Sequence, residues 1–185
     1  AALTAHTSNL VRFRADWQAH DFPVTGRVFL LLGAGGSARA VAYGLAKSGA
    51  PVHILARRVV QAEEVIADLR PYLPQTQLTS HPLNELAQVV ATLSAPLIIN
   101  STPLGMTPNE ASTPWPSDLP FPARATVYDL VYNPRRTWLM QQAEAADCRA
   151  VNGLGMLVQQ GAKAFALWTG VEPDTAVMAA AIKQV

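Results

Sequence analysis

Six small residues directly after a short apolar run could hold a phosphate group. Residues 33–38 read Gly-Ala-Gly-Gly-Ser-Ala and fit the pattern G-x-G-x-x-A, with an apolar run before them and an Ala-rich stretch after them. In that setting the first glycine permits a tight turn, the second lets a pyrophosphate approach the backbone, and the final alanine lets a helix pack closely on a strand. The free N–H groups at the helix start would face the phosphates. We therefore predict a dinucleotide-binding loop, with a plain chain-reversing turn as the alternative. Its residues are Gly33, Ala34, Gly35, Gly36, Ser37 and Ala38.

The residues after the second apolar run indicate which dinucleotide would bind. NAD sites carry Asp or Glu about 20 residues past the glycines, where the carboxylate binds the ribose hydroxyls. This sequence has Ala56, Arg57 and Arg58 there instead. A guanidinium group can bind a phosphate through two parallel hydrogen bonds. Arg57 and Arg58 thus favour the 2′-phosphate of NADP, and a solvated basic turn is the alternative.

Other residue types that often do chemistry are less informative here. The four histidines lack the spacing of metal ligands, so we predict no metal site. They are His6, His20, His53 and His81. Cys148 is the only cysteine, which excludes an internal disulfide and fits a reducing compartment such as the cytoplasm. Asp129, at a strand end, could serve catalysis or bind neighbouring backbone N–H groups. Trp115 could belong to a mobile lid or anchor a loop.

These residues must be positioned by strands and helices that alternate along the chain. Short apolar runs predict strands at residues 27–32, 51–56, 75–79, 97–100, 127–130 and 149–151, and amphipathic stretches predict helices at 37–48, 60–69, 83–93, 137–146, 156–169 and 175–183. Residues 103–122 contain six prolines and must form a surface loop. The alternation predicts an α/β fold, a doubly wound (Rossmann) and mostly parallel six-stranded sheet with helices on both faces.

Composition excludes several classes of partner. The chain has 185 residues, a formal net charge of +1 and 50% hydrophobic residues, which is typical of a globular domain. So small a charge disfavours nucleic acid or an anionic membrane surface as partner, and a small-molecule substrate is expected instead. No apolar run approaches the 18 residues of a membrane span, and no secretory signal is visible. The chain does not begin with Met, so we expect it to be part of a longer product. The oligomeric state is left open.

Four separate blocks stand in order along the chain: GAGGSAR at 33–39, NSTPLGM at 100–106, VYDLVYNP at 127–134 with Thr137, and NGLGMLVQQ at 152–160. Together they resemble the shikimate and quinate dehydrogenase family. The resemblance covers the C-terminal, NADP-binding domain of that family. It implies that residues 1–22 form a linking helix region, that 23–185 form the NADP-binding Rossmann domain, and that the N-terminal substrate domain is absent from this chain.

The resemblance also implies a role for particular residues. Arg57 is similar to the family's arginine for the 2′-phosphate, and Tyr132 and Gln160 stand where the family reaches its substrate. The remaining implied contacts lie along the nicotinamide half of the cofactor: Ser101, Thr102 and Pro103 beside the ribose, and Gly153 and Met156 at the nicotinamide ring. For Met156, packing in the core is the alternative.

The chain departs from the family where proton transfer is concerned. Asn9 stands at the position of the family's catalytic Asp, and an amide cannot act as a carboxylate in proton transfer. The only lysines are Lys47, Lys163 and Lys183, and none lies in a segment that resembles the family's catalytic lysine motif. The family's clamp usually reads Asn-Arg-Thr with a further basic residue three positions on, whereas this chain has Ala56-Arg57-Arg58 with Gln61. No catalytic residue is therefore secure.

The implied activity is the reversible, NADP-dependent reduction of 3-dehydroshikimate to shikimate in aromatic amino-acid biosynthesis. We expect the isolated chain to bind NADPH and to be inactive. One alternative is a non-catalytic NADP-binding or sensor module. Another is a related NADP-dependent reductase with a different substrate.

Overall fold

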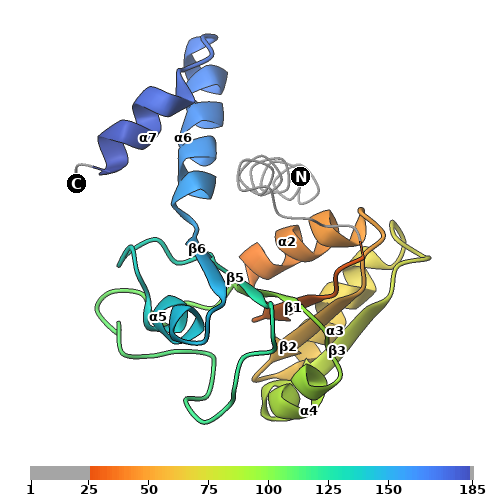
Figure 1. Cartoon of the computed structure of the whole chain (residues 1–185). Helices are drawn as coiled ribbons and strands as arrows, with labels where there is room; N and C mark the ends of the chain where they lie inside the picture. Colours follow the sequence, from red (N-terminus) through yellow and green to blue (C-terminus); the bar gives the residue numbers. More distant parts are fainter. Residues whose placement is uncertain (1–25, 184–185) are drawn as a thin grey trace.

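The computed structural model describes residues 26–183, which form a six-stranded parallel sheet between layers of helices (Figure 1). The strands lie in the order β3-β2-β1-β4-β5-β6. Their bounds are β1 Phe29–Leu32, β2 Val52–Ala56, β3 Leu78–Pro82, β4 Leu97–Asn100, β5 Thr126–Asp129 and β6 Arg149–Asn152. Every pairing is parallel, and β1 lies between β2 and β4, where the strand order reverses. The predicted fold class is therefore confirmed.

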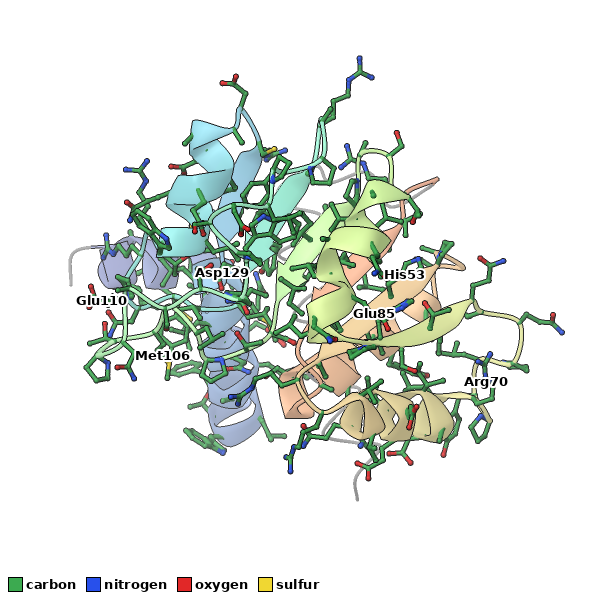
Figure 2. All side chains as sticks on the ribbon, turned by 90° about the horizontal axis from the view of Figure 1, so that it is seen from below. His53, Arg70, Glu85, Met106, Glu110 and Asp129 are labelled. Carbon is green, nitrogen blue, oxygen red and sulfur yellow. The ribbon has the colours of Figure 1, made fainter. Side chains whose placement is uncertain are left out.

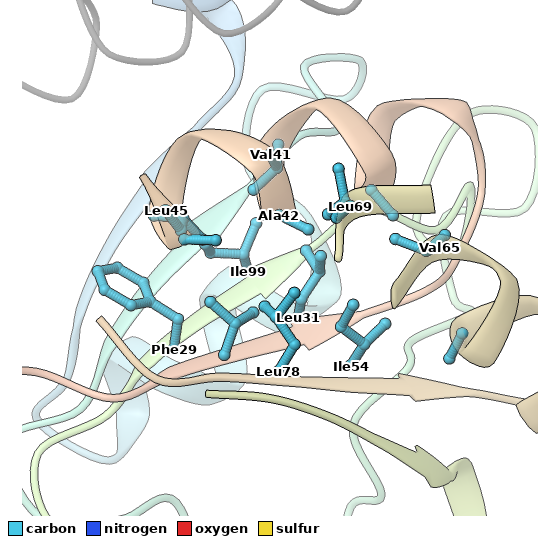
Figure 3. Packing of buried hydrophobic residues seen from close by; sticks show 14 of the residues in the cluster. Phe29, Leu31, Val41, Ala42, Leu45, Ile54, Val65, Leu69, Leu78 and Ile99 are labelled. Carbon is cyan, nitrogen blue, oxygen red and sulfur yellow. The ribbon is translucent and has the colours of Figure 1, made fainter. Parts of the chain in front are cut away.

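Helices cover both faces of the sheet, because side chains of each central strand point alternately to the two sides. On one face Phe29 and Leu31 pack against α2 (Gly36–Ala46) and α3 (Val59–Leu69), as Figure 3 shows. On the other face Leu30 and Leu32 pack with residues of α4 (Leu86–Ala91) and α5 (Trp138–Ala145). All four β1 side chains are fully buried. This explains why residues 29–32 read as an unbroken apolar run rather than an alternating one.

Two helices follow β6 and extend away from the sheet (Figure 1). They are α6 (Leu154–Thr169) and α7 (Thr175–Lys183), and Gly170 ends α6 in the left-handed conformation. The first half of α6 packs on the sheet through Met156, whereas its second half carries exposed apolar side chains.

The predicted strands and helices agree with the structure to within two residues at each end, apart from two elements. The third strand was expected at residues 75–79 but runs over Leu78–Pro82, because only from Leu78 onward does the chain pair with β2. Thr76 instead donates its hydroxyl to the Ala46 carbonyl and ends the preceding turn. The helix expected over 83–93 is divided into a short 3-10 helix, η1 (Leu83–Glu85), and α4.

The Pro-rich segment has no helix or strand, as predicted, and is anchored by Trp115. This side chain is fully buried, stacks on Phe121 with ring centroids 4.5 Å apart, and donates its indole N–H to the Leu119 carbonyl. Of the two alternatives for Trp115, the structure therefore favours the loop anchor.

The linking region over residues 1–22, with Asn9, His6 and His20, lies outside the described residues. Among the described helices, none is long and apolar enough to cross a membrane.

Candidate dinucleotide site

The glycine loop that follows β1 is held close to the loop that follows β4. The Gly33 N–H donates to the Leu55 carbonyl, and Gly33 has φ of +105°. A Cβ at this position would lie 2.8 Å from Ser101 Oγ and 3.0 Å from Thr102 Cγ2. Only glycine accepts both the backbone conformation and the close approach. The predicted tight turn is thus fixed by a neighbour that lies 68 residues further along the chain.

The start of α2 is open to a ligand. Gly35 is the N-cap of α2 and Gly36 its first residue, and a Cβ at either would meet no atom within 4 Å. No side chain caps the helix, and its first turn holds no acidic residue. Ala38, by contrast, is fully buried in the core and lets α2 lie close to the sheet. The free N–H groups and the helix dipole make this end suitable for an anion such as a pyrophosphate.

Arg57 and Arg58 lie beside the glycine loop, at the end of the neighbouring strand. β1 and β2 pair in register with Leu32 opposite Leu55, so Gly33 and Ala56 leave the sheet at the same level. Both arginines are exposed, and Arg58 is the N-cap of α3. Two guanidinium groups at this place suit the 2′-phosphate of an NADP molecule whose pyrophosphate lies on α2.

Asn100, the last residue of β4, holds the loop that contains Ser101, Thr102 and Pro103. Its Oδ1 accepts hydrogen bonds from the Thr102 N–H (2.9 Å) and hydroxyl (2.7 Å), and its Nδ2 donates to the Leu104 carbonyl. The Ser101 hydroxyl donates to the Leu32 carbonyl at 2.7 Å. Asn100 is fully buried and was not among the predicted site residues. A polar residue that ends an apolar strand is the signal that could have revealed it.

Asp129, the last residue of β5, connects three segments at the carboxyl ends of the strands. Its Oδ1 accepts from Asn100 Nδ2 (2.9 Å) and the Val131 N–H (3.0 Å), and its Oδ2 accepts from the Thr137 hydroxyl (2.6 Å). Thr137 also caps α5 by accepting from the Met140 N–H. Burial raises the pKa of Asp129 to about 6, while these hydrogen bonds oppose the rise. Of the two alternatives, the structural role is therefore the one favoured. Figure 2 shows Asp129 inside the fold, away from Met106 and Glu110 on the outer loop.

A cavity of about 380 Å³ opens at the carboxyl end of the strands. It brings together five of the predicted site residues, Ser37, Ser101, Thr102, Pro103 and Tyr132. Its other lining residues are Met106, Thr107, Leu130, Val131 and Asn133. None of the lining side chains is an acid, a lysine, an arginine or a histidine. The cavity therefore suits an uncharged, partly apolar group.

Gly153, Met156 and Gln160 do not line this cavity but lie on or next to the helix behind it. A Cβ at Gly153 would lie 2.5 Å from the carbonyl oxygen of Leu130, which lines the cavity. Only glycine at position 153 therefore lets the start of α6 pack this closely on Leu130. Met156 is 9% exposed and belongs to the core cluster, in agreement with the packing alternative. Gln160 is half-buried on α6.

His53 and His81 form a contact that their sequence spacing did not predict. His53 Nδ1 lies 3.1 Å from His81 Nε2, and the Thr79 hydroxyl lies within 3.2 Å of both nitrogens. The Glu85 carboxylate lies 3.7 Å from His81 Nδ1. Across residues 26–183, no group of three or more His, Cys, Asp or Glu side chains could hold a metal ion.

An open parallel sheet that carries a glycine loop, a basic turn and a cavity at the point where its strand order reverses defines a dinucleotide-binding domain of the doubly wound class. Comparisons with known proteins identify the family. The family model of the shikimate 5′-dehydrogenase C-terminal domain matches residues 153–183. The shikimate dehydrogenase (NADP(+)) of Salinibacter ruber is 44% identical over 147 residues, which cover 78% of this chain and 51% of that protein. The chain belongs to the shikimate dehydrogenase family and matches its C-terminal part, as the four blocks predicted.

Solved structures agree with this assignment. The shikimate 5-dehydrogenase of Thermus thermophilus, in complex with NADP(H) and shikimate, has a TM-score of 0.77 at 31% identity, over 96% of this chain and 62% of that one. A 5-ketofructose reductase of a Gluconobacter strain has a TM-score of 0.71 at 28% identity, over 96% and 62% of the two chains. This chain spans about half the length of the first curated relative and less than two thirds of either structure.

Proposed function

We propose that this chain is the NADP-binding portion of an oxidoreductase that interconverts 3-dehydroshikimate and shikimate in aromatic amino-acid biosynthesis. One observation carries the proposal. The open start of α2, the Arg57–Arg58 turn and the cavity all lie at the carboxyl ends of the strands. These three features match the pyrophosphate, the 2′-phosphate and the nicotinamide half of one extended molecule. A reducing compartment such as the cytoplasm suits the single, buried thiol of Cys148.

The residues of this chain would bind and orient the cofactor. The N–H groups of the α2 start hold the pyrophosphate, and Arg57, with Arg58 beside it, holds the 2′-phosphate. Ser101, Thr102 and Pro103 border the nicotinamide ribose, and their loop is held rigid by buried Asn100. When bound, the cofactor supplies or accepts a hydride at the nicotinamide ring. Gly153 and Met156 shape the wall behind that ring, because α6 packs closely on Leu130.

Tyr132 and Gln160 are the residues we propose for substrate contact. Tyr132 is 44% exposed at the cavity mouth, so its hydroxyl is available to a substrate hydroxyl or carboxylate. The cavity lining contains no acid, lysine or histidine. Proton transfer would therefore depend on groups from the substrate domain that we predict outside this chain. We expect the chain alone to bind NADPH and to show no shikimate oxidation, and measurable turnover would contradict this assignment.

Titration with NADPH and NADH tests cofactor choice. We expect Arg57→Ala to weaken NADPH binding at least tenfold and to leave NADH binding unchanged, because only NADPH carries the 2′-phosphate. Lys47→Ala is the matched control, since it removes the same charge at the far end of α2. If NADH binds as tightly as NADPH and Arg57→Ala changes neither affinity, the role proposed for the basic turn is wrong.

Reduction of a different carbonyl substrate is a second candidate function. The similarity to a 5-ketofructose reductase favours it, because that enzyme has the same fold over 96% of this chain. A non-catalytic NADP-binding module remains the third hypothesis. These three are separated by joining the chain to a substrate domain of the family and assaying 3-dehydroshikimate and 5-ketofructose in parallel.

A further inference from the structure

Met106 is a large apolar side chain at the mouth of the cavity, and it takes no part in the cofactor contacts proposed above. It lines the cavity together with Tyr132 and is 46% exposed, whereas Val131 in the same wall is buried. Figure 2 shows Met106 on the outer loop of the molecule. An exposed apolar side chain at the edge of a cavity without charged lining residues is suited to contact with a ligand.

The backbone on both sides of Met106 is held by hydrogen bonds. The Met106 N–H donates to the Pro103 carbonyl at 3.2 Å, and the Met106 carbonyl accepts from the Asn109 N–H at 2.8 Å. The Thr107 N–H donates to the Asn133 carbonyl at 3.1 Å, which ties this loop to the segment that follows β5. The fold therefore fixes where Met106 stands, and its side chain is the adaptable part of a fixed rim.

The loop that carries Met106 also packs on the buried groups at the strand ends. The Gly105 N–H donates to Ser112 Oγ at 2.9 Å, and a Cβ on Gly105 would lie 3.5 Å from Thr137 Cβ. Thr137 is fully buried and donates its hydroxyl to Asp129 at 2.6 Å. The same network that holds the strand-end loops thus supports the rim of the cavity.

We propose that Met106 covers the nicotinamide ring of bound NADPH and keeps water from it. This inference rests on the proposed function, which places the nicotinamide half of the cofactor in the cavity. The reduced ring is nearly flat and uncharged, so an apolar cover removes no charge from water. A methionine side chain adapts well to such a surface, because it is unbranched, has three rotatable bonds and carries a polarisable sulfur.

The position of Met106 favours the ring over the substrate as the group that it covers. Its N–H donates directly to Pro103, which we propose to border the nicotinamide ribose. The ring is bonded to that ribose, so a side chain beside Pro103 lies within reach of the ring. Tyr132, in contrast, presents a hydroxyl, which suits a polar substrate.

Titration of the full chain with two molecules tests this role. One is NADPH, and the other is ADP-ribose 2′-phosphate, which has the same phosphates and adenosine but no nicotinamide ring. We expect Met106→Ala to weaken NADPH binding about five- to tenfold and to leave the affinity for ADP-ribose 2′-phosphate unchanged, because only NADPH presents a ring to cover. Bound NADPH should also fluoresce less and at longer wavelength in Met106→Ala than in the wild-type chain, since water then reaches the ring.

Two further variants separate a ring contact from a general effect on the loop. Met106→Leu should restore most of the NADPH affinity and fluorescence, because leucine is apolar and close to methionine in volume. Tyr72→Ala is the matched control, since it truncates a 53% exposed side chain that does not line the cavity. We expect Tyr72→Ala to change neither affinity.

Three results would overturn the proposal. The first is an equal loss of affinity for both molecules in Met106→Ala, because Met106 would then only support the loop. The second is no change in NADPH affinity or fluorescence, because Met106 would then not reach the ring. The third is equal affinity of the wild-type chain for the two molecules, which would leave the phosphate contacts standing and remove the ring contact. Failure of the wild-type chain to bind either molecule would refute the proposed cofactor function itself, and with it the inference that rests on it.

Discussion

Replacing Gly33 with alanine tests whether close approach of two loops builds the phosphate site. Gly33 has φ of +105°, and its Cβ would lie 2.8 Å from Ser101 Oγ. Ser101 cannot move away freely, because its hydroxyl donates to the Leu32 carbonyl and its N–H donates to the same oxygen. Alanine at position 33 therefore meets both an unfavourable backbone conformation and a collision.

Gly49 provides a control that separates these two costs. It has φ of +80°, and a Cβ there would meet no atom within 4 Å. Gly49→Ala should cost only the backbone strain of a left-handed alanine, about 1–2 kcal/mol. Gly33→Ala should cost about 1–3 kcal/mol more, which is the usual penalty for overpacking a site that cannot relax. The smaller unfolded-state entropy of alanine applies to both variants and cancels in the comparison.

Urea unfolding and NADPH titration measure the two consequences. Gly33→Ala should lower the free energy of unfolding by more than Gly49→Ala does. It should also weaken NADPH binding at least tenfold, because the glycine loop would be displaced from its position at the start of α2. The Gly33→Ala/Ser101→Ala double variant should regain part of the lost stability, since the 2.8 Å contact is removed. Equal destabilisation by the two single variants, together with unchanged NADPH affinity, would refute this reasoning.

Three further predictions concern buried or half-buried side chains. Burial raises the pKa of Asp129 from 3.8 to about 6. As the pH rises, the unfolded chain therefore loses this proton before the folded chain does. The folded chain should lose up to about 3 kcal/mol of stability between pH 4 and pH 7. Asp129→Asn should flatten this part of the pH dependence of urea unfolding, and an unchanged slope would contradict the assignment. Burial and the neighbouring His81 lower the pKa of His53, so stability is complete above the usual value of 6.5 and declines as pH falls below it. His53→Gln should weaken that decline in urea midpoints measured from pH 8 to pH 5, and an unaltered decline would argue against it. Trp115→Ala should cost about 3–5 kcal/mol in thermal or urea unfolding, as for other buried tryptophans, whereas Trp138→Ala, at a 45% exposed position, should cost much less. An equally small loss of stability in both variants would contradict the anchor role and favour the lid alternative for Trp115.

The features predicted correctly from the sequence depend on neighbouring residues. The phosphate loop needs only a strand, a turn and a helix start within a few residues, so residues 33–38 carry the whole signal. Buried parallel strands likewise appear as short apolar runs, and β1, β2 and β4 lie where those runs occur. The edge strand β3 has a weaker apolar pattern, because Leu78 is the only one of its residues that is buried. Its predicted bounds therefore lie three residues too early.

The features that sequence reasoning missed depend on residues far apart in the chain. Asn100 meets Asp129 because β4 and β5 are neighbours in the sheet, and Ser101 limits Gly33 because β1 lies beside β4. His53 and His81 come together because β2 and β3 pair in parallel. None of these contacts follows from spacing along the sequence. They follow from strand order, which the alternation of strands and helices leaves undetermined.

The residues that line the cavity can position a cofactor, and the buried carboxylate beside them has a structural task. This carboxylate, Asp129, is fully buried and occupied by three hydrogen bonds that hold the strand-end loops together. The cavity wall offers hydroxyls, amides and apolar groups, which can orient a nicotinamide ring, and it holds no carboxylate, lysine, arginine or histidine. A hydride transfer to a carbonyl also requires a proton for the oxygen. Under the function proposed above, we therefore expect this proton to come from a group outside the cavity lining.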